Sequence, residues 1–161
     1  MEVQNKMFEV VEKKEINDEE RSIVAWGSRP VLDRDMEKIA ADAKWELDNF
    51  KKNPVLCISH DYSKLPVGKV LWTKVTSEGL RFKAQFAKTP TGEELWTLYK
   101  DGIMNAFSIG FLPLKYTEPD MVKSGEPRRI YEHLELLEIS CVSIPSCPAA
   151  IMEMYNDGKI K

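Results

Sequence analysis

Short apolar runs separated by polar turns recur along this 161-residue chain, and most of them have the length and alternation of β-strands. Residues 7–13 and 21–26 are two such runs, and the polar stretch 17–20 between them predicts a turn. Residues 55–59 form a short continuous apolar run, which is typical of a buried strand. These runs predict three strands in the N-terminal part of the chain.

Residues 70–75 and 80–86 predict a hairpin around the turn sequence Ser77-Glu78-Gly79. In the second arm apolar and polar residues alternate, so one face of that arm should meet a core. The apolar positions of this arm are Leu80, Phe82, Ala84 and Phe86.

Strand character returns in the C-terminal part, at residues 104–111 and 130–144. The polar segment 117–129 between them contains two prolines and a glycine, and it predicts a surface loop. We expect one domain at residues 1–150, followed by a C-terminal helix or flexible tail at residues 151–161.

A helix is predicted between Asp33 and Asn53, because apolar residues recur there at steps of three and four. Asp33 or Asp35 can cap its start, and Asn53-Pro54 should stop it. The apolar positions that share one face of this predicted helix are Met36, Ile39, Ala40, Ala43, Leu47 and Phe50.

A second helix is predicted at residues 90–101, where Thr91 and Glu94 have the spacing of a capping box and Gly102 suits the C-terminal cap. Six or seven short strands with these helices indicate an α+β fold that is mainly β. We expect a curled antiparallel sheet or β-barrel flanked by two or three helices.

Composition and charge restrict the kinds of molecule that the protein is expected to bind. Hydrophobic residues make up 43% of the chain and charged residues 30%, and the formal net charge is −3 with no long block of like charges. This balance argues against nucleic acid or an anionic membrane as the main partner. The apolar runs fall short of the roughly 20 residues of a membrane span. Residues 1–11 lack the apolar core of a signal peptide, so we expect no export.

Only two histidines, His60 and His133, could serve as a catalytic base. His60 ends the apolar run 55–59 and precedes a polar turn, a position at a sheet edge where an imidazole can face a cleft. The same pattern also suits a surface or capping histidine, and the residues around it leave both interpretations open.

Ser108 is the candidate nucleophile, because it lies in the middle of a predicted strand between small residues. Alternation places it on a face that we expect to be open, and Gly110 leaves room there for the close approach of another backbone. The alternative is a serine on a solvated sheet face. Ala106, Ser108 and Gly110 share this face, while Phe107, Ile109 and Phe111 share the other.

Glu138 lies in an otherwise apolar strand, where a carboxylate is costly to bury without a partner. It is therefore a candidate to orient a histidine, although an outward-facing glutamate fits the pattern as well. The cysteines Cys57, Cys141 and Cys147 lack metal-site spacing and predict reduced thiols. Cys57 or Cys141 with His60 is a weaker alternative nucleophile, since both lie in apolar runs. We expect no metal and no cofactor.

Taken in order, these blocks resemble the prohead maturation protease family of tailed phages. Residues 53–60, which lead into His60, and residues 65–69 after them resemble the histidine block of the family. Ser-Ile-Gly-Phe at 108–111 is similar to its serine block, and residues 137–150 are similar to its C-terminal block. The resemblance covers about residues 21–150.

This resemblance implies a fold shared with the herpesvirus assembly proteases and a serine endopeptidase activity. By position, Ser108 would be the nucleophile, His60 the base and Glu138 the third member. The herpesvirus relatives use a second histidine as third member, so His133 is the alternative. Five residues separate His133 from Glu138, and strand alternation predicts that they face opposite ways unless a bulge intervenes.

The resemblance also implies where the protein acts and on what. Its substrates would be the scaffold, the arms of the major capsid protein and the protease itself, inside the immature phage head in the bacterial cytoplasm. The resemblance leaves open whether the protein forms homo-oligomers. The alternative function is a non-catalytic scaffolding or capsid-assembly domain on the same fold, and the presence of all three site residues argues against it.

Overall fold

The structure is a computed structural model that describes residues 4–8, 16–120 and 123–144. The predicted C-terminal helix or tail lies outside these residues, as does Cys147. Within them the chain forms one mixed sheet and two short helices. The strands are β1 (Gln4–Phe8), β2 (Ile16–Asn17), β3 (Ser22–Ser28), β4 (Glu37–Glu46), β5 (Val55–Ile58), β6 (Gly68–Thr76), β7 (Gly79–Phe86), β8 (Ala106–Thr117) and β9 (Arg129–Val142), and the helices are α1 (Asp48–Lys52) and α2 (Pro90–Lys100).

The strands are ordered β1-β8-β9-β5-β6-β7-β3-β2, and β4 also pairs with β9. The expectation of an antiparallel sheet is wrong at two pairs, because β4 and β5 both run parallel to β9. The two strands follow one another along the same edge of this long strand, with α1 between them, so they share its direction. Among the described residues the end strands β1 and β2 do not pair with each other, and the sheet is not a closed barrel.

The predicted helix at residues 33–53 is wrong for most of its length. Residues 37–46 form β4, and helix α1 is limited to Asp48–Lys52, with Asn53 as the C-terminal cap as expected. The pairing of β4 with β9 shifts register between Ile39 and Lys44, so the strand lacks the clean two-residue alternation that identifies strands. Its alanines favour a helix locally, and pairing with β9 overrides that preference.

The predicted hairpin, second helix and C-terminal strands are confirmed. Of the predicted strand at residues 7–13 only residues 7 and 8 are described, as the end of β1, and residues 9–13 lie outside the described part of the chain. The hairpin of β6 and β7 turns at Gly79, and β7 buries alternate residues as predicted. Helix α2 begins two residues earlier than its expected capping box: Thr89, rather than Thr91, is the N-cap, and its hydroxyl accepts from the Gly92 N–H at 3.2 Å. Proline at the next position suits this start, because it lacks the N–H that a first turn leaves unpaired. Gly102 follows the helix with a φ of 74°.

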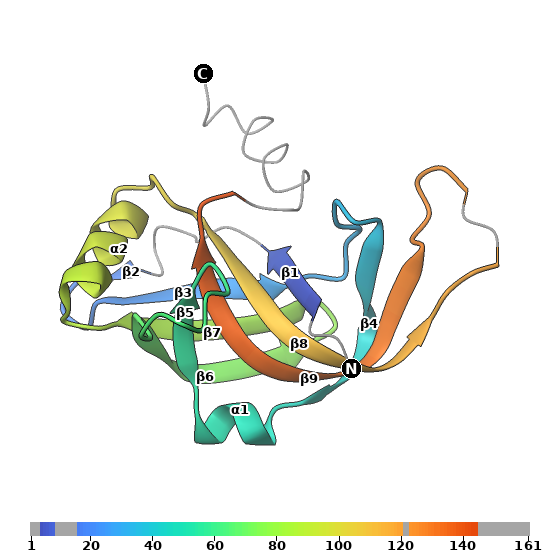
Figure 1. The fold of residues 1–161 in the computed structure, drawn as a ribbon, viewed down its shortest axis with the longest axis horizontal. Coiled ribbons are helices and arrows are strands. Elements are labelled where there is room, and N and C mark those ends of the chain that lie inside the picture. The colour runs from blue at the N-terminus through green and yellow to red at the C-terminus, as the bar shows by residue number, and fades with distance from the viewer. Residues whose placement is uncertain (1–3, 9–15, 121–122, 145–161) are drawn as a thin grey trace.

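The core fixes which way β8 faces. Figure 1 shows β8 and β9 crossing in front of β3, β6 and β7, and β3 contacts β8 across the core. The Phe107 ring on β8 meets Phe82 of β7 edge-on at 5.0 Å between centroids, and Tyr99 of α2 stacks on it at 4.7 Å. Such aromatic pairs contribute roughly 0.5–1.5 kcal/mol beyond their buried area. With Phe107, Ile109 and Phe111 anchored in the core, the residues between them face the opposite side of the strand.

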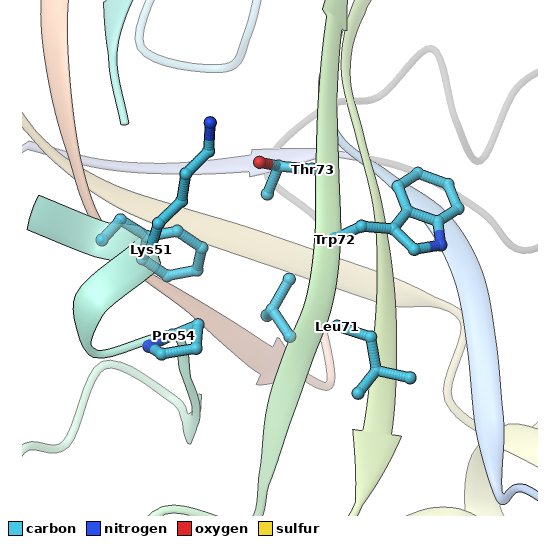
Figure 2. Close-up of a pocket in the computed structure, with 7 residues that line it drawn as sticks. Lys51, Pro54, Leu71, Trp72 and Thr73 are labelled. Atoms are coloured by element: carbon cyan, nitrogen blue, oxygen red, sulfur yellow. The ribbon is translucent and has the colours of Figure 1, made fainter. Parts of the chain in front are cut away.

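A shallow pocket lies between α1 and β6, with a volume of about 310 Å³ (Figure 2). Lys51 and Pro54 lie on one side of it, and residues 71–73 lie on the other. Its lining is mainly apolar and includes none of the candidate catalytic residues, so this hollow is distinct from the site described next.

Candidate active site

A tight turn after β5 carries His60. Ser59 and His60 both have left-handed backbone conformations, with φ of 50° and 54°, which are uncommon for residues other than glycine. The Ser59 N–H donates to the Cys141 carbonyl at 2.9 Å, and the Asp61 N–H donates to the Ile58 carbonyl at 2.9 Å. These bonds hold the turn against β9 and direct the His60 side chain across β9 toward β8.

Ser108 lies near the N-terminal end of β8, on the side opposite the core residues Phe107 and Ile109. Its Oγ is 2.5 Å from His60 Nε2. The expectation that this face is open is wrong, because Ser108 is fully buried. The turn after β5 lies over this face, as the approach of Tyr62 toward Gly110 also shows.

Glu138 of β9 is almost completely buried, and donors satisfy both of its carboxylate oxygens. Oε1 accepts from His60 Nδ1 and, at 3.2 Å, from the Tyr62 hydroxyl. Oε2 accepts from the Ser140 hydroxyl at 2.7 Å. These donors offset the cost of burying a carboxylate, and they fix its orientation toward the imidazole.

Gly110 gives this carboxylate its space. Gly110 pairs with Glu138 across the β8–β9 ladder. A Cβ at this position would lie 2.5 Å from Glu138 Oε1 and 3.0 Å from the Tyr62 hydroxyl, closer than real side chains allow. The sequence-based expectation that another backbone approaches Gly110 closely is therefore wrong in this structure, because the Glu138 and Tyr62 side chains fill that space.

His133, the alternative partner for His60, lies elsewhere. Its Nε2 is 2.8 Å from Glu46 Oε1 on β4. Five residues along a strand separate it from Glu138 by roughly 16 Å. The alternation that would turn the two residues to opposite faces is interrupted, and they share one face of β9.

A β-bulge explains this. Gly110 pairs with Glu138 but Phe111 pairs with Leu136, so Leu137 is the extra residue in β9. Leu136 and Ile139 are both fully buried in the core although three positions separate them. The bulge therefore changes the alternation between the two ends of β9 and turns Glu138 to the side that faces His60.

The cysteines are poor candidates for a nucleophile. Burial, with a smaller effect from the Glu138 charge, raises the pKa of the Cys57 thiol to about 11. Burial likewise raises the pKa of the Cys141 thiol to about 12. Both thiols are therefore protonated near neutral pH, and the protonated form is the unreactive one.

Tyr62 and Ser140 belong to the site although the sequence had not indicated them. Alternation places Ser140 on the same face as Glu138, so the strand pattern contained a signal for it. Tyr62 had none, because its direction depends on the left-handed turn at residues 59 and 60. Burial, followed by the charge of Glu138, raises the pKa of the Tyr62 phenol well above its ordinary value. The phenol stays protonated and acts as a donor.

Comparison with known proteins places this chain in a family. The sequence pattern of the family described as the caudovirus prohead serine protease matches residues 10–159, nearly the whole chain. The chain belongs to this family. The prohead serine proteases are peptidases, so the resemblance found in the sequence blocks is confirmed.

Two curated relatives of this prohead protease family member come from phages. The prohead protease of Escherichia phage T5 is 32% identical over 101 residues, which are 62% of this chain and 44% of that protein. The capsid polyprotein of Pseudomonas phage PAJU2 is 25% identical over 149 residues, which are 88% of this chain and 21% of that protein. The chain thus spans less than half the length of these relatives.

A solved structure supports the fold. The bacteriophage T4 capsid assembly protease, gp21, superposes with a TM-score of 0.65 at 11% identity, over 89% of this chain and 98% of that one. At this level of identity the likeness concerns the fold alone. In the part of the chain that the structure describes, neither helix has the length and apolar character needed to cross a membrane.

Proposed function

We propose that this chain is a serine endopeptidase in which Ser108 is the nucleophile, His60 the general base and Glu138 the residue that orients the imidazole. One observation carries the proposal. In a member of a serine protease family, the Ser108 hydroxyl lies against one nitrogen of His60 and the Glu138 carboxylate against the other. The same constellation occurs on several unrelated protease folds, where it is recognised by geometry and roles.

The contacts favour one tautomer of His60. A carboxylate can only accept hydrogen bonds, so Nδ1, which contacts Glu138, carries the proton. Nε2 then presents its lone pair to the Ser108 hydroxyl at 2.5 Å. This is the arrangement that a general base needs to take a proton from a serine.

The reaction that follows is acyl transfer. Ser108 Oγ forms a bond to the scissile carbonyl carbon while its proton passes to His60 Nε2. The C–N bond then breaks as His60 returns this proton to the leaving amine, and water hydrolyses the acyl-enzyme by the same route. Glu138 stabilises the imidazolium that forms between these steps. Because Ser108 is fully buried without substrate, a bound peptide has to displace part of what covers it.

The proposed substrates are the scaffold, the arms of the major capsid protein and the protease itself, cleaved inside the immature head in the host cytoplasm. The family description and a relative named as a capsid polyprotein support this. We assign the activity to a protease domain at residues 1–150 and relate its fold to the herpesvirus assembly proteases.

Co-expression with the capsid subunit and scaffold of the same phage tests this proposal. We expect shortened forms of these proteins with the wild-type chain and full-length forms with Ser108→Ala. A fluorophosphonate probe, which phosphonylates activated serines and releases fluoride, should label Ser108 and no site in the variant. A wild-type chain that is neither labelled nor able to cleave, but still enters heads, would support the non-catalytic assembly domain instead.

A further inference from the structure

A second serine, Ser140, touches two of the three proposed catalytic residues. It lies on β9, two positions after Glu138, and is fully buried. Its hydroxyl donates to Glu138 Oε2 at 2.7 Å and accepts from the backbone N–H of His60 at 3.1 Å. One hydroxyl therefore connects the carboxylate of one residue to the main chain of the other.

The His60 turn has a specific need for this contact. Strand β5 ends at Ile58, so the N–H groups of Ser59 and His60 lie beyond its ladder with β9. Ser59 still donates to the Cys141 carbonyl, whereas His60 donates to the Ser140 side chain. Two consecutive left-handed residues persist only where the surroundings hold them. The Ser140 hydroxyl is one of the two groups of β9 that do so.

The Glu138 carboxylate also depends on a hydrogen bond from Ser140 for its orientation. His60 and Tyr62 both contact Oε1 of Glu138, while Ser140 contacts Oε2. A carboxylate held at one oxygen can still rotate about its Cγ–Cδ bond. A donor on Oε2 prevents this rotation and keeps Oε1 directed at His60 Nδ1. Ser140 therefore restrains both sides of the His60–Glu138 contact.

We propose that Ser140 is a positioning residue of the active site, whose hydroxyl holds the His60 turn and the Glu138 carboxylate in one geometry. This inference rests on the proposed function, since it assumes that His60 activates Ser108. Ser140 pairs with Ser108 across the β8–β9 ladder, and its hydroxyl bonds to Glu138 and to the His60 N–H. As a positioning residue that acts through these two, it should slow the chemical step when it is lost, without weakening the binding of a ligand at Ser108.

The test compares Ser140→Ala with the wild type through the rate of Ser108 labelling by a fluorophosphonate probe. We expect the maximal labelling rate to fall about 10- to 100-fold, the range for loss of a hydrogen bond to a charged group, while the half-saturating probe concentration stays unchanged. Ser140→Thr, which keeps the hydroxyl, should recover part of the rate. The Nδ1 proton of His60 should give a far-downfield NMR signal in the wild type that moves upfield or broadens in Ser140→Ala.

Ser22→Ala is the matched control. Ser22 is also fully buried on a strand, and its hydroxyl donates to the carboxylate of Glu20 at 2.9 Å, away from the site. This control should leave the labelling rate and the downfield signal unchanged. Equal labelling of Ser140→Ala and the wild type, with the same NMR signal, overturns the inference but leaves the proposed function intact. Absence of labelling at Ser108 in the wild type overturns both.

Discussion

Strand β9 contributes to two histidine–carboxylate pairs, one in each half of the strand, and the contrast between them shows what separates the proposed catalytic pair from an ordinary ion pair. In its C-terminal half Glu138 contacts His60, with side chains 4% and 15% exposed. In its N-terminal half His133 contacts Glu46, with side chains 27% and 41% exposed. Both pairs lie on the same face of the sheet.

The difference lies in what surrounds each pair. Glu138 is buried and receives three donors, and the second nitrogen of His60 meets a serine hydroxyl. Glu46 is solvated, and its other bonded neighbour among the described residues is the flexible ammonium of Lys44. An ion pair in water contributes little and orients little, whereas a buried and fully bonded pair holds one geometry. The short sequence separation between His133 and Glu138 therefore does not indicate a role for His133 in the site.

The largest predicted effect comes from removing the attacking oxygen. Ser108→Ala should reduce cleavage by about 10⁶-fold, the effect of removing a serine nucleophile in a comparable protease. The fold should remain, because the loss of one hydroxyl leaves β8 anchored by its aromatic neighbours. Cleavage of the capsid subunit and a circular dichroism spectrum measure the two properties. Undiminished cleavage by the purified variant would exclude Ser108 as the nucleophile.

Glu138→Gln should have the second-largest effect, a loss of as much as roughly 10⁴-fold in turnover. The amide keeps the shape of the side chain but removes the charge that stabilises imidazolium, and it can present an N–H toward His60. Turnover of a peptide taken from a mapped cleavage site measures this. If Glu138→Gln were nearly fully active while His133→Gln were not, the roles assigned to the two halves of β9 would have to be exchanged.

Gly110→Ala should have an intermediate effect. The new methyl group would lie 2.5 Å from Glu138 Oε1, so the carboxylate must move away from His60. We expect a loss of about 10- to 100-fold in turnover, comparable to the loss of one hydrogen bond to a charge. Gly27→Ala is the control, because its Cβ meets side chains of the core at 3.3 Å, remote from the carboxylate. A similar loss of turnover in both variants, with equally lowered melting temperatures, would point to packing instead of the site.

Chemical modification of the thiols should change turnover little. With the pKa of Cys57 raised to about 11, its thiol is protonated at neutral pH and reacts slowly with iodoacetamide. Cys57→Ser should retain turnover within about twofold, since the thiol neither attacks nor holds His60. Rapid loss of activity on alkylation at pH 7, absent from Cys57→Ser, would revive the cysteine alternative.

The sequence predicted the parts of this fold in which local pattern and tertiary contacts agree. β7 alternates cleanly because one of its faces lies in the core, and the first half of β8 alternates large core residues with small ones. Ser108 and His60 lie where the predicted strands place them. The prediction failed at β4, where an irregular register with β9 hides the strand period and alanines favour a helix. It also failed at the face of Ser108, because the direction of the turn at residues 59 and 60 depends on left-handed backbone angles that nothing in those residues requires.

The bulge at Leu137 limited the site prediction in the same way. Alternation counted from His133 gives the wrong face for Glu138, since one extra residue in β9 reverses the pattern. A bulge is a property of the paired strands and not of one of them, and no residue type at 137 identifies it. Glu138 could still be chosen from the sequence because a carboxylate in an apolar strand needs a partner wherever it points.

The smallest predicted effect belongs to the exposed pair. His133→Gln should leave turnover within about twofold of the wild type, since the nearest proposed catalytic residue on β9 is roughly 16 Å away along the strand.

The effect of His133→Gln should appear in the free energy of unfolding, with a defined pH dependence. The hydrogen bond from His133, followed by that from Lys44, lowers the pKa of Glu46 below its ordinary value. A carboxyl whose pKa is lowered by folding stabilises the protein above its unfolded pKa, and this contribution is lost as the pH falls through the lowered value. The wild type should therefore be slightly more stable than His133→Gln at neutral pH, and urea unfolding curves of the two should converge on acidification. A stability difference that grew as the pH fell would mean that the Glu46 pair does not act as described, and a large loss of turnover would reopen the question of which histidine–carboxylate pair on β9 serves the active site.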